Sequence, residues 1–135
     1  YTLIDQDSLH TGMKACLDRG VSVIVGAPFA SGILATGSAG ATHYNYSAAD
    51  QAIVEKVRGI EEVCAIHNVS LQAAALQFPL AHPAAASIIP GAAKPEELIA
   101  NIGSIDDDIP SAFWDDLKSR GLIVPDAPVP QESDA

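Results

Sequence analysis

The stretch at residues 87–101, SIIPGAAKPEELIAN, decides the fold expected for this chain of 135 residues. Its apolar start, 87–89, predicts a strand that ends at Pro90. A helix is expected to begin near Pro95, because proline fits the first turn of a helix. A strand that passes into a helix within a few residues leaves backbone N–H groups pointing outward, and such helix starts bind phosphates. The stretch therefore predicts a strand–helix unit with a candidate anion site.

The same alternation of strands and helices extends over the rest of the chain. Apolar runs at 1–4 and 21–25 predict two more strands, and the second, VSVIV, is expected to be buried on both faces. A long loop is expected at 26–47. Apolar residues at helical spacing predict four further helices, at 8–20, 47–67, 70–80 and 110–121. Strands that alternate with helices indicate parallel strands joined by right-handed crossovers.

Three such units would form a partial sheet with two open edges. An eight-stranded barrel would remove those edges and needs about 250 residues. We therefore expect an α/β chain that forms the C-terminal portion of a (β/α)8 TIM barrel, about strands 6 to 8 with their helices. On this interpretation residues 1–135 are a single partial domain with an extended tail at 122–135. We also expect the sequence, which starts within a strand, to be a piece of something longer.

Composition excludes several classes of partner. The formal net charge of −10 argues against nucleic acid and anionic membranes, because both are polyanions. Cys16 and Cys64 lie in apolar helical patterns, which favours free thiols in a reducing compartment over a disulfide. No apolar run reaches about 18 residues, so no transmembrane helix is expected. These features together predict a cytoplasmic protein.

A second loop shares the pattern of the first. VIVGAPFASGIL at 23–34 is an apolar strand followed by a Gly- and Pro-containing turn. In a barrel, the loops at 27–34 and 90–101 would both lie at the C-terminal mouth, where the last two loops frequently bind phosphate. Glycine and proline can instead do no more than form turns. From the loops alone, both interpretations stay open.

Four motifs resemble those of the aldo-keto reductase family. VIVGAPFASGIL is similar to the family's strand followed by Ser-Pro-Leu-x-x-Gly-Leu-Leu, and IIPGAAKPEELIAN to its Ile-Pro-Gly-Ala segment, which ends in Asn. AIHNVSLQAAALQFPLAHP resembles its helix pair, and IPSAFWDDLKSRGLI its last helix. Within the family, YTLID, GAPFASGILATG and LIVPDAPVP are most similar to the branch of aldose (threo-aldose or fucose) 1-dehydrogenases and pyridoxal 4-dehydrogenases.

The resemblance implies a function and its partners. It implies an NAD(P)-dependent oxidoreductase that oxidises a sugar or pyridoxal-type hemiacetal to a lactone. The implied partners are a small-molecule aldehyde, sugar or pyridoxal-like substrate and the remainder of the barrel. The loop at 27–34 would wrap the cofactor pyrophosphate, and the loop at 90–101 would hold the adenosine end. The cofactor-binding residues implied are Gly26, Ala27, Pro28, Phe29, Ser31, Gly32, Leu34, Pro90, Gly91, Ala92, Lys94, Glu97 and Asn101.

Two positions depart from the family's pattern. The family often has an aromatic residue that stacks on the nicotinamide where Gly26 stands, so that contact is lost or supplied by Phe29. Members that prefer NADP carry a basic residue where Glu97 stands. A carboxylate repels a 2′-phosphate but accepts a hydrogen bond from a free ribose hydroxyl. We therefore expect NAD in preference to NADP, which stays possible because Lys94 is nearby.

The family's catalytic tetrad of Asp, Tyr, Lys and His is expected upstream of Tyr1. No catalytic residue is therefore assigned within the chain, and the 135 residues alone are predicted to be inactive. His43, Tyr44 and Tyr46 could supply a general acid or could pack the long loop. Neither the histidine spacing nor the run at 106–108 predicts a metal site. The alternative function is a non-catalytic fragment or subunit of this family that only binds cofactor or assembles.

Overall fold

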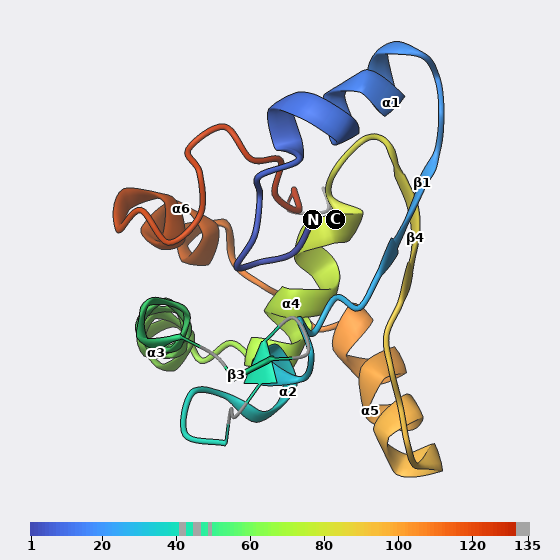
Figure 1. Ribbon diagram of the computed structural model, residues 1–135. Helices are drawn as coiled ribbons and strands as arrows, with labels where there is room; N and C mark the ends of the chain where they lie inside the picture. Colours follow the sequence, from blue (N-terminus) through green and yellow to red (C-terminus); the bar gives the residue numbers. More distant parts are fainter. Residues whose placement is uncertain (41–42, 45–46, 49, 132–135) are drawn as a thin grey trace.

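The computed structural model describes residues 1–40, 43–44, 47–48 and 50–131 (Figure 1). The segment 26–47, predicted to be a loop throughout, contains a short helix and two short strands. The elements are the π-helix η1 (Leu9–Met13), α1 (Lys14–Asp18), β1 (Val23–Gly26), α2 (Ile33–Thr36), β2 (His43–Tyr44), β3 (Ser47–Ala48), α3 (Gln51–His67), α4 (Leu71–Leu80), β4 (Ala85–Ile89), α5 (Pro95–Ile105) and α6 (Ser111–Ser119).

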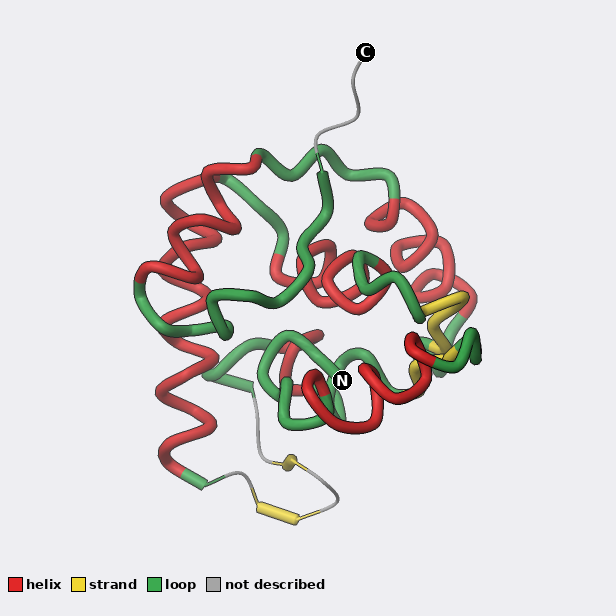
Figure 2. The backbone as a smooth tube through the Cα atoms, turned by 90° about the horizontal axis from the view of Figure 1, so that it is seen from above, coloured by secondary structure: helices red, strands yellow, loops and turns green. Residues whose placement is uncertain are grey.

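Two strands that are far apart in the sequence pair in parallel. β1 and β4 are hydrogen-bonded neighbours, with Val25 opposite Ile88 and Gly26 opposite Ile89. Both strands therefore end at the same edge, and the loops that follow them leave from that edge. In two views at right angles, the pair lies at one side of the molecule (Figures 1 and 2). The parallel pairing predicted from the alternation of strands and helices is confirmed.

The prediction of a strand at 1–4 is wrong. Thr2 and Asp5 form a single antiparallel bridge that closes a turn, with N···O distances of 2.8 and 3.2 Å. A β-strand needs a neighbour for its backbone groups, and none lies beside this segment within the described part of the chain. The segment instead supplies core residues, since Leu3 is 0% and Ile4 4% exposed. The described portion therefore contains two of the three parallel strands that we expected.

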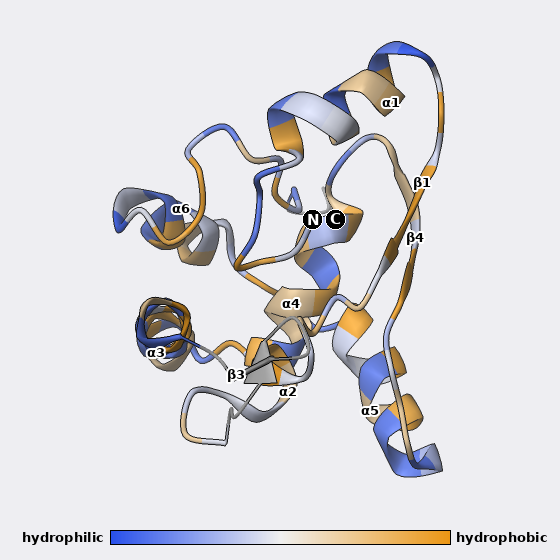
Figure 3. Cartoon of the chain, in the orientation of Figure 1, coloured by the Kyte–Doolittle hydropathy of each residue, from blue (hydrophilic) through white to orange (hydrophobic). Residues whose placement is uncertain are grey.

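The prediction that strand 21–25 is buried on both faces is also wrong for this chain. Of the four residues of β1 only Val25 is buried, and Ile24 is 62% exposed. Its partner strand leaves Ile89 61% exposed. β4 packs against α4, and no other helix among the described residues packs comparably against the pair (Figure 3 shows the apolar residues along both strands). Both strands are apolar, as the sequence indicated, but no element among the described residues buries their exposed side chains.

The long helices start and stop at recognisable signals. Asp50, not Ser47, caps α3, and its carboxylate accepts a hydrogen bond from the Ile53 N–H at 2.9 Å. Asn68 ends α3 in the left-handed conformation, with φ 54°. Ser70 caps α4 as predicted, and its side chain accepts from the Ala73 N–H. A polar side chain that accepts from the third N–H satisfies one of the free donors at a helix start.

The core forms around α4, which contacts β4, α5, α2 and α3. Trp114 and Phe113 of α6 and Phe78 of α4 are fully buried and pack ring to ring. The tail also contributes, because Ile123 and Ala127 are 2% and 1% exposed. Val124 N–H donates to Oε1 of Gln6 at 3.3 Å. This bond ties the tail to the N-terminal segment.

Both cysteines are free thiols, Cys64 buried and Cys16 half-buried. No helix among the described residues is long and apolar enough to span a bilayer.

Candidate cofactor-binding site

The structure brings the two candidate loops to one pocket. The pocket has a volume of about 330 Å3, within the range of about 300–1,000 Å3 that ligand sites occupy. It combines Phe29, from the loop after β1, with residues that follow β4. Its lining residues are Phe29, Ala35, Thr36, Gln72, Gly91, Glu97, Ala100 and Asn101. The parallel pairing of β1 with β4 explains this meeting, since both loops leave from the same edge of the pair.

The loop after β1 has an unusual backbone. Three residues with side chains adopt positive φ, namely Ala27 (50°), Ala30 (49°) and Ser31 (61°), and Gly32 follows at 94°. The left-handed region costs energy for residues that carry a Cβ, and such residues cluster at ligand-binding loops. Hydrogen bonds hold the turn, with the Ala30 N–H 2.9 Å from the Ala27 carbonyl oxygen. The loop therefore has a defined turn conformation.

Open space lies beside all three predicted glycines, Gly26, Gly32 and Gly91. A Cβ added at any of them would meet no atom within 4 Å. A ligand could thus approach the backbone closely at these positions, which is one reason for glycine at a cofactor site. Phe29, in contrast, is 8% exposed and belongs to the core. Its ring packs in the core and also lines the pocket, and both alternatives for the aromatic contact missing at Gly26 stay predictions.

Two polar side chains of α5, Glu97 and Asn101, fix the loop that follows β4. Glu97 Oε2 accepts a hydrogen bond from the Ala93 N–H at 2.7 Å. The bond resembles a capping box, in which a carboxylate in the first turn reaches back to the start of the helix. Asn101 is 5% exposed, and its Nδ2 donates to the Gly91 carbonyl oxygen at 3.4 Å. Each residue thus keeps at least one oxygen that these bonds do not use.

The predicted residues divide into three groups. Phe29, Gly91, Glu97 and Asn101 line the pocket. Leu34 is fully buried in the core and can only support the loop from behind. The remaining predicted residues lie at the end of β1 or on the two loops and do not line the pocket: Gly26, Ala27, Pro28, Ser31, Gly32, Pro90, Ala92 and Lys94.

Sequence reasoning missed four lining residues: Ala35, Thr36, Gln72 and Ala100. Helical spacing could have found Ala100, which lies three residues after Glu97 and beside Asn101 on α5. No local signal marks the other three, because their position depends on how α2 and α4 pack.

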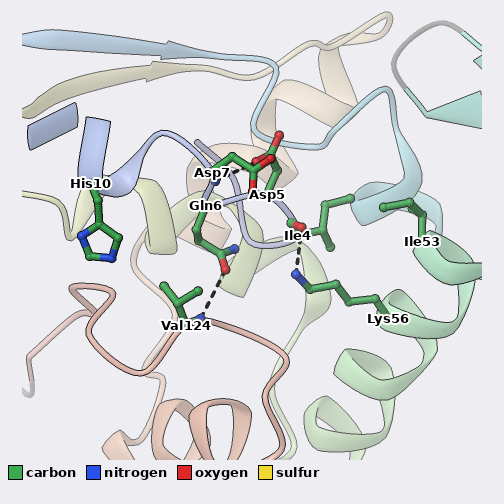
Figure 4. Close-up of a pocket in the computed structure, with 8 residues that line it drawn as sticks. All are labelled: Ile4, Asp5, Gln6, Asp7, His10, Ile53, Lys56 and Val124. Carbon is green, nitrogen blue, oxygen red and sulfur yellow. Dashed lines mark hydrogen bonds between the residues drawn. The ribbon is translucent and has the colours of Figure 1, made fainter. Parts of the chain in front are cut away.

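A larger cavity of about 520 Å3 lies between the N-terminal segment, α3 and the tail (Figure 4). Lys56 Nζ donates to the Ile4 carbonyl oxygen at 2.9 Å, and Gln6 donates to the carbonyl oxygens of Thr2 and Leu3. Burial lowers the pKa of Lys56, and the carboxylates of Asp5 and Asp7 oppose part of that effect. These polar groups satisfy backbone atoms, so they hold three segments together.

The other polar residues considered as candidates do not form a second functional site among the described residues. No group of three or more His, Cys, Asp or Glu side chains within the described ranges could hold a metal ion. His82, expected at a helix end, follows α4 but is 4% exposed, and its Nδ1 accepts from the Ala84 N–H. Tyr46 and the side chains of His43 and Tyr44 lie outside what the structure describes, so their suggested role stays a prediction.

Comparison with known proteins shows the family of this chain. The family model described as the aldo/keto reductase family matches residues 1–120, and the chain belongs to that family. The chain is 36% identical over 123 residues to a pyridoxal 4-dehydrogenase from Microbacterium luteolum and 29% identical over 124 residues to a D-threo-aldose 1-dehydrogenase from a Pseudomonas species. Each alignment covers 91% of this chain but only 36% and 38% of those proteins.

A solved structure supports the fold. The apo form of an aldo-keto reductase from Bacillus halodurans matches with a TM-score of 0.68 and 22% identity. The match covers 98% of this chain and 44% of that one. The described elements therefore have the arrangement found in a part of an aldo-keto reductase.

Proposed function

We propose that this chain is the dinucleotide-binding, C-terminal part of a (β/α)8 barrel in an NAD(P)-dependent oxidoreductase. The observation that carries the proposal is the pocket where Phe29 meets Gly91, Glu97 and Asn101. Open space beside Gly26 and Gly91 and the left-handed backbone at Ala27, Ala30 and Ser31 fit a ligand that lies against the main chain. Parallel strands that end at one edge are also the arrangement that barrels use for their binding sites.

Exposed apolar surface supports the barrel part of the proposal. Ile24 and Ile89 on the strand pair, and Ile99 and Ile102 on α5, are each more than half exposed. A monomer rarely leaves so many large apolar side chains together in water. Further strand–helix units would cover them. The alignments, which span 36% to 38% of the curated relatives, leave room for such units.

The substrate that we propose is a sugar or pyridoxal-type hemiacetal, which would be oxidised to a lactone. The two curated relatives support it, since one is a pyridoxal dehydrogenase and the other an aldose dehydrogenase by name. A bound nicotinamide dinucleotide would accept the hydride from the hemiacetal carbon. The hydroxyl proton needs a base, which we place outside the 135 residues. The residues of this chain would hold and orient the dinucleotide, with Ser31 and the backbone of its loop toward the pyrophosphate.

We propose NAD as the preferred form because of Glu97. One of its oxygens already accepts from Ala93, and the other is free to accept from a ribose hydroxyl. A 2′-phosphate would bring negative charge toward this carboxylate. Lys94 is the one cation near it in the loop, and its side chain makes no capping bond to the helix.

Binding measurements on the full-length protein test the proposal. Titration calorimetry with NAD and with NADP should give tighter binding of NAD. Glu97→Arg should move the preference toward NADP, whereas Glu96→Arg, on the same helix turn but outside the pocket, should leave it in place. A wild-type preference for NADP of more than about tenfold, roughly 1.4 kcal/mol, contradicts the assignment of NAD. Absence of binding to both supports the alternative, a fragment or subunit that only assembles.

A further inference from the structure

We propose that Gln72 is a specificity-determining residue of this pocket, which selects adenine by accepting a hydrogen bond from its exocyclic amino group. The inference rests on the dinucleotide function proposed above and adds to it a residue of α4 that neither loop contains. Gln72 lines the same pocket as Glu97 and Asn101 but reaches it from the helix that packs behind α2.

The hydrogen bonds of the two pocket amides fix their orientation. Gln72 Nε2 donates to the Ala35 carbonyl oxygen at 3.2 Å, and Asn101 Nδ2 donates to the Gly91 carbonyl oxygen at 3.4 Å. A main-chain carbonyl can only accept, so the nitrogen of each amide must face it. Within the part of the chain that the structure describes, no residue donates to the amide oxygen of Gln72 or of Asn101. Both oxygens are therefore available to a ligand.

The two other polar side chains of the pocket, those of Thr36 and Glu97, also offer hydrogen-bond acceptors to a ligand. Thr36 Oγ1 donates its hydrogen to the Gly32 carbonyl oxygen at 3.1 Å, which leaves the hydroxyl as an acceptor. Glu97 is an acceptor with no hydrogen of its own when ionised. All four polar side chains thus offer oxygen lone pairs. Such a pocket favours a ligand that presents N–H or O–H groups and disfavours one that presents oxygen.

This chemistry distinguishes two bases of nearly equal size. Adenine carries an amino group, a donor, where hypoxanthine carries an oxo group, an acceptor. The amino group would satisfy an amide oxygen, whereas the oxo group would face it without a proton between them. An unmatched polar pair costs more than a matched pair contributes, so the pocket should discriminate mainly by rejecting the oxo group.

Gln77 provides a matched control on the same helix. Its Nε2 donates to the Ser104 and Asp107 carbonyl oxygens at 3.0 and 2.8 Å, which joins α4 to the end of α5. It does not line the pocket. Replacement of either glutamine by leucine removes one amide from α4, but only the change at position 72 removes an acceptor from the pocket.

The test uses the full-length protein with NAD and nicotinamide hypoxanthine dinucleotide, which differ at this group and at the adjacent N1, where hypoxanthine carries a proton. Calorimetry should show tighter binding of NAD by the wild type. Gln72→Leu should lower the ratio of the two dissociation constants about fivefold, the effect expected for one hydrogen bond. Gln77→Leu should leave the ratio unchanged.

The other possible results of this experiment contradict either the inference about Gln72 or the proposed function. Equal affinity of the wild type for the two dinucleotides overturns the inference, and so does a ratio that Gln72→Leu leaves unchanged while NAD still binds. In both cases the proposed function stands. Failure of the folded wild type to bind either dinucleotide contradicts the proposed function, and the inference falls with it.

Discussion

The side-chain nitrogen of Lys56 and the main-chain oxygen of Ile4 lie 2.9 Å apart, and their hydrogen bond joins two segments 52 residues apart in sequence. Ile4 is 4% exposed, so its carbonyl has little access to water as a substitute partner. The ammonium thus stabilises the N-terminal segment against α3, although burial makes its charge less favourable.

Lys56→Met should therefore destabilise the protein. Methionine keeps the length of the aliphatic side chain but cannot donate, so the free energy of unfolding should fall by about 1–2 kcal/mol. Urea denaturation measures the loss. The control is Lys14→Met, because Lys14 pairs with Asp18 at the surface, where both side chains are more than half exposed. That change should cost less than about 0.5 kcal/mol, and equal losses would show that the Lys56 bond does not stabilise the fold.

His82 should make stability depend on pH in the acidic range. Burial lowers its pKa from 6.5 in the folded protein, and Nδ1 accepts from the Ala84 N–H at 3.1 Å, which requires that nitrogen to be unprotonated. The unfolded chain therefore takes up the proton first. The contribution of His82 is fully present above pH 6.5 and is lost as the pH falls toward the lowered value.

The change in urea midpoint between pH 7.5 and pH 5.5 measures this effect. His82→Asn keeps an acceptor but cannot be protonated, so its midpoint should change less than that of the wild type. His10→Gln, at a side chain that is 67% exposed, should change as much as the wild type. The same pH dependence in all three proteins would contradict the role of His82.

The two thiols should differ in reactivity. Burial, followed by the nearby Glu61 carboxylate, raises the pKa of Cys64 to about 12. The thiolate is the reactive form, so a disulfide reagent at pH 8 should label Cys16 in the folded protein and Cys64 only after unfolding. Mass spectrometry of the labelled peptides identifies the site. Equal labelling rates in the folded protein would contradict the prediction.

The same pKa shift has a consequence for stability. Because the folded pKa of Cys64 lies above the unfolded value of 9.0, its contribution is present below pH 9 and is lost as the pH rises toward 12. Cys64→Ala should therefore flatten the loss of stability between pH 9 and pH 10.5, and Cys16→Ala should not. Tyr1, whose pKa burial raises to about 12, adds a loss of the same sign above pH 10 in every variant.

The exposed apolar face should cause the isolated 135-residue chain to associate. Ile99 and Ile102 on α5 are 69% and 58% exposed, and Ile24 and Ile89 on the strand pair are 62% and 61% exposed. Each 100 Å2 of apolar surface removed from water contributes about 2.5 kcal/mol. We expect oligomers in sedimentation and binding of a hydrophobic dye. Replacement of both isoleucines by glutamate should shift the chain toward the monomer, and Ile66→Glu, on α3 and 61% exposed, should not. A wild-type monomer that binds no dye would contradict the partial-barrel proposal.

The sequence predicted those elements whose signals are local. Ser70 as a cap, Pro95 in a first turn and the β-branched run of β1 each depend on residues that are neighbours in the chain. Its errors lie where distant packing decides. The run at 1–4 has strand composition but no partner to pair with, and it folds into a turn.

The residues of the candidate site also differ in whether local sequence or distant packing places them. Glu97 and Asn101 are implied by the resemblance of the segment IIPGAAKPEELIAN to a family motif, which lies within one continuous stretch of sequence. Gln72 could not be predicted in this way, because it enters the pocket through the packing of α4 against α2, a contact between distant parts of the chain. Positive φ at Ala30 and Ser31 was also beyond sequence reasoning, since alanine and serine seldom adopt it.

The buried tail bears on how the protein can be joined to other molecules. Ile123 and Ala127 fill the core, and the Val124 N–H is held by Gln6, so the chain is integral to the fold well beyond the end of α6. An affinity tag or fluorescent fusion that replaces the chain after Gly121 would remove these contacts. The N-terminal segment would then lose its hydrogen bond to the tail. Attachment beyond Gln131 leaves every one of these contacts in place.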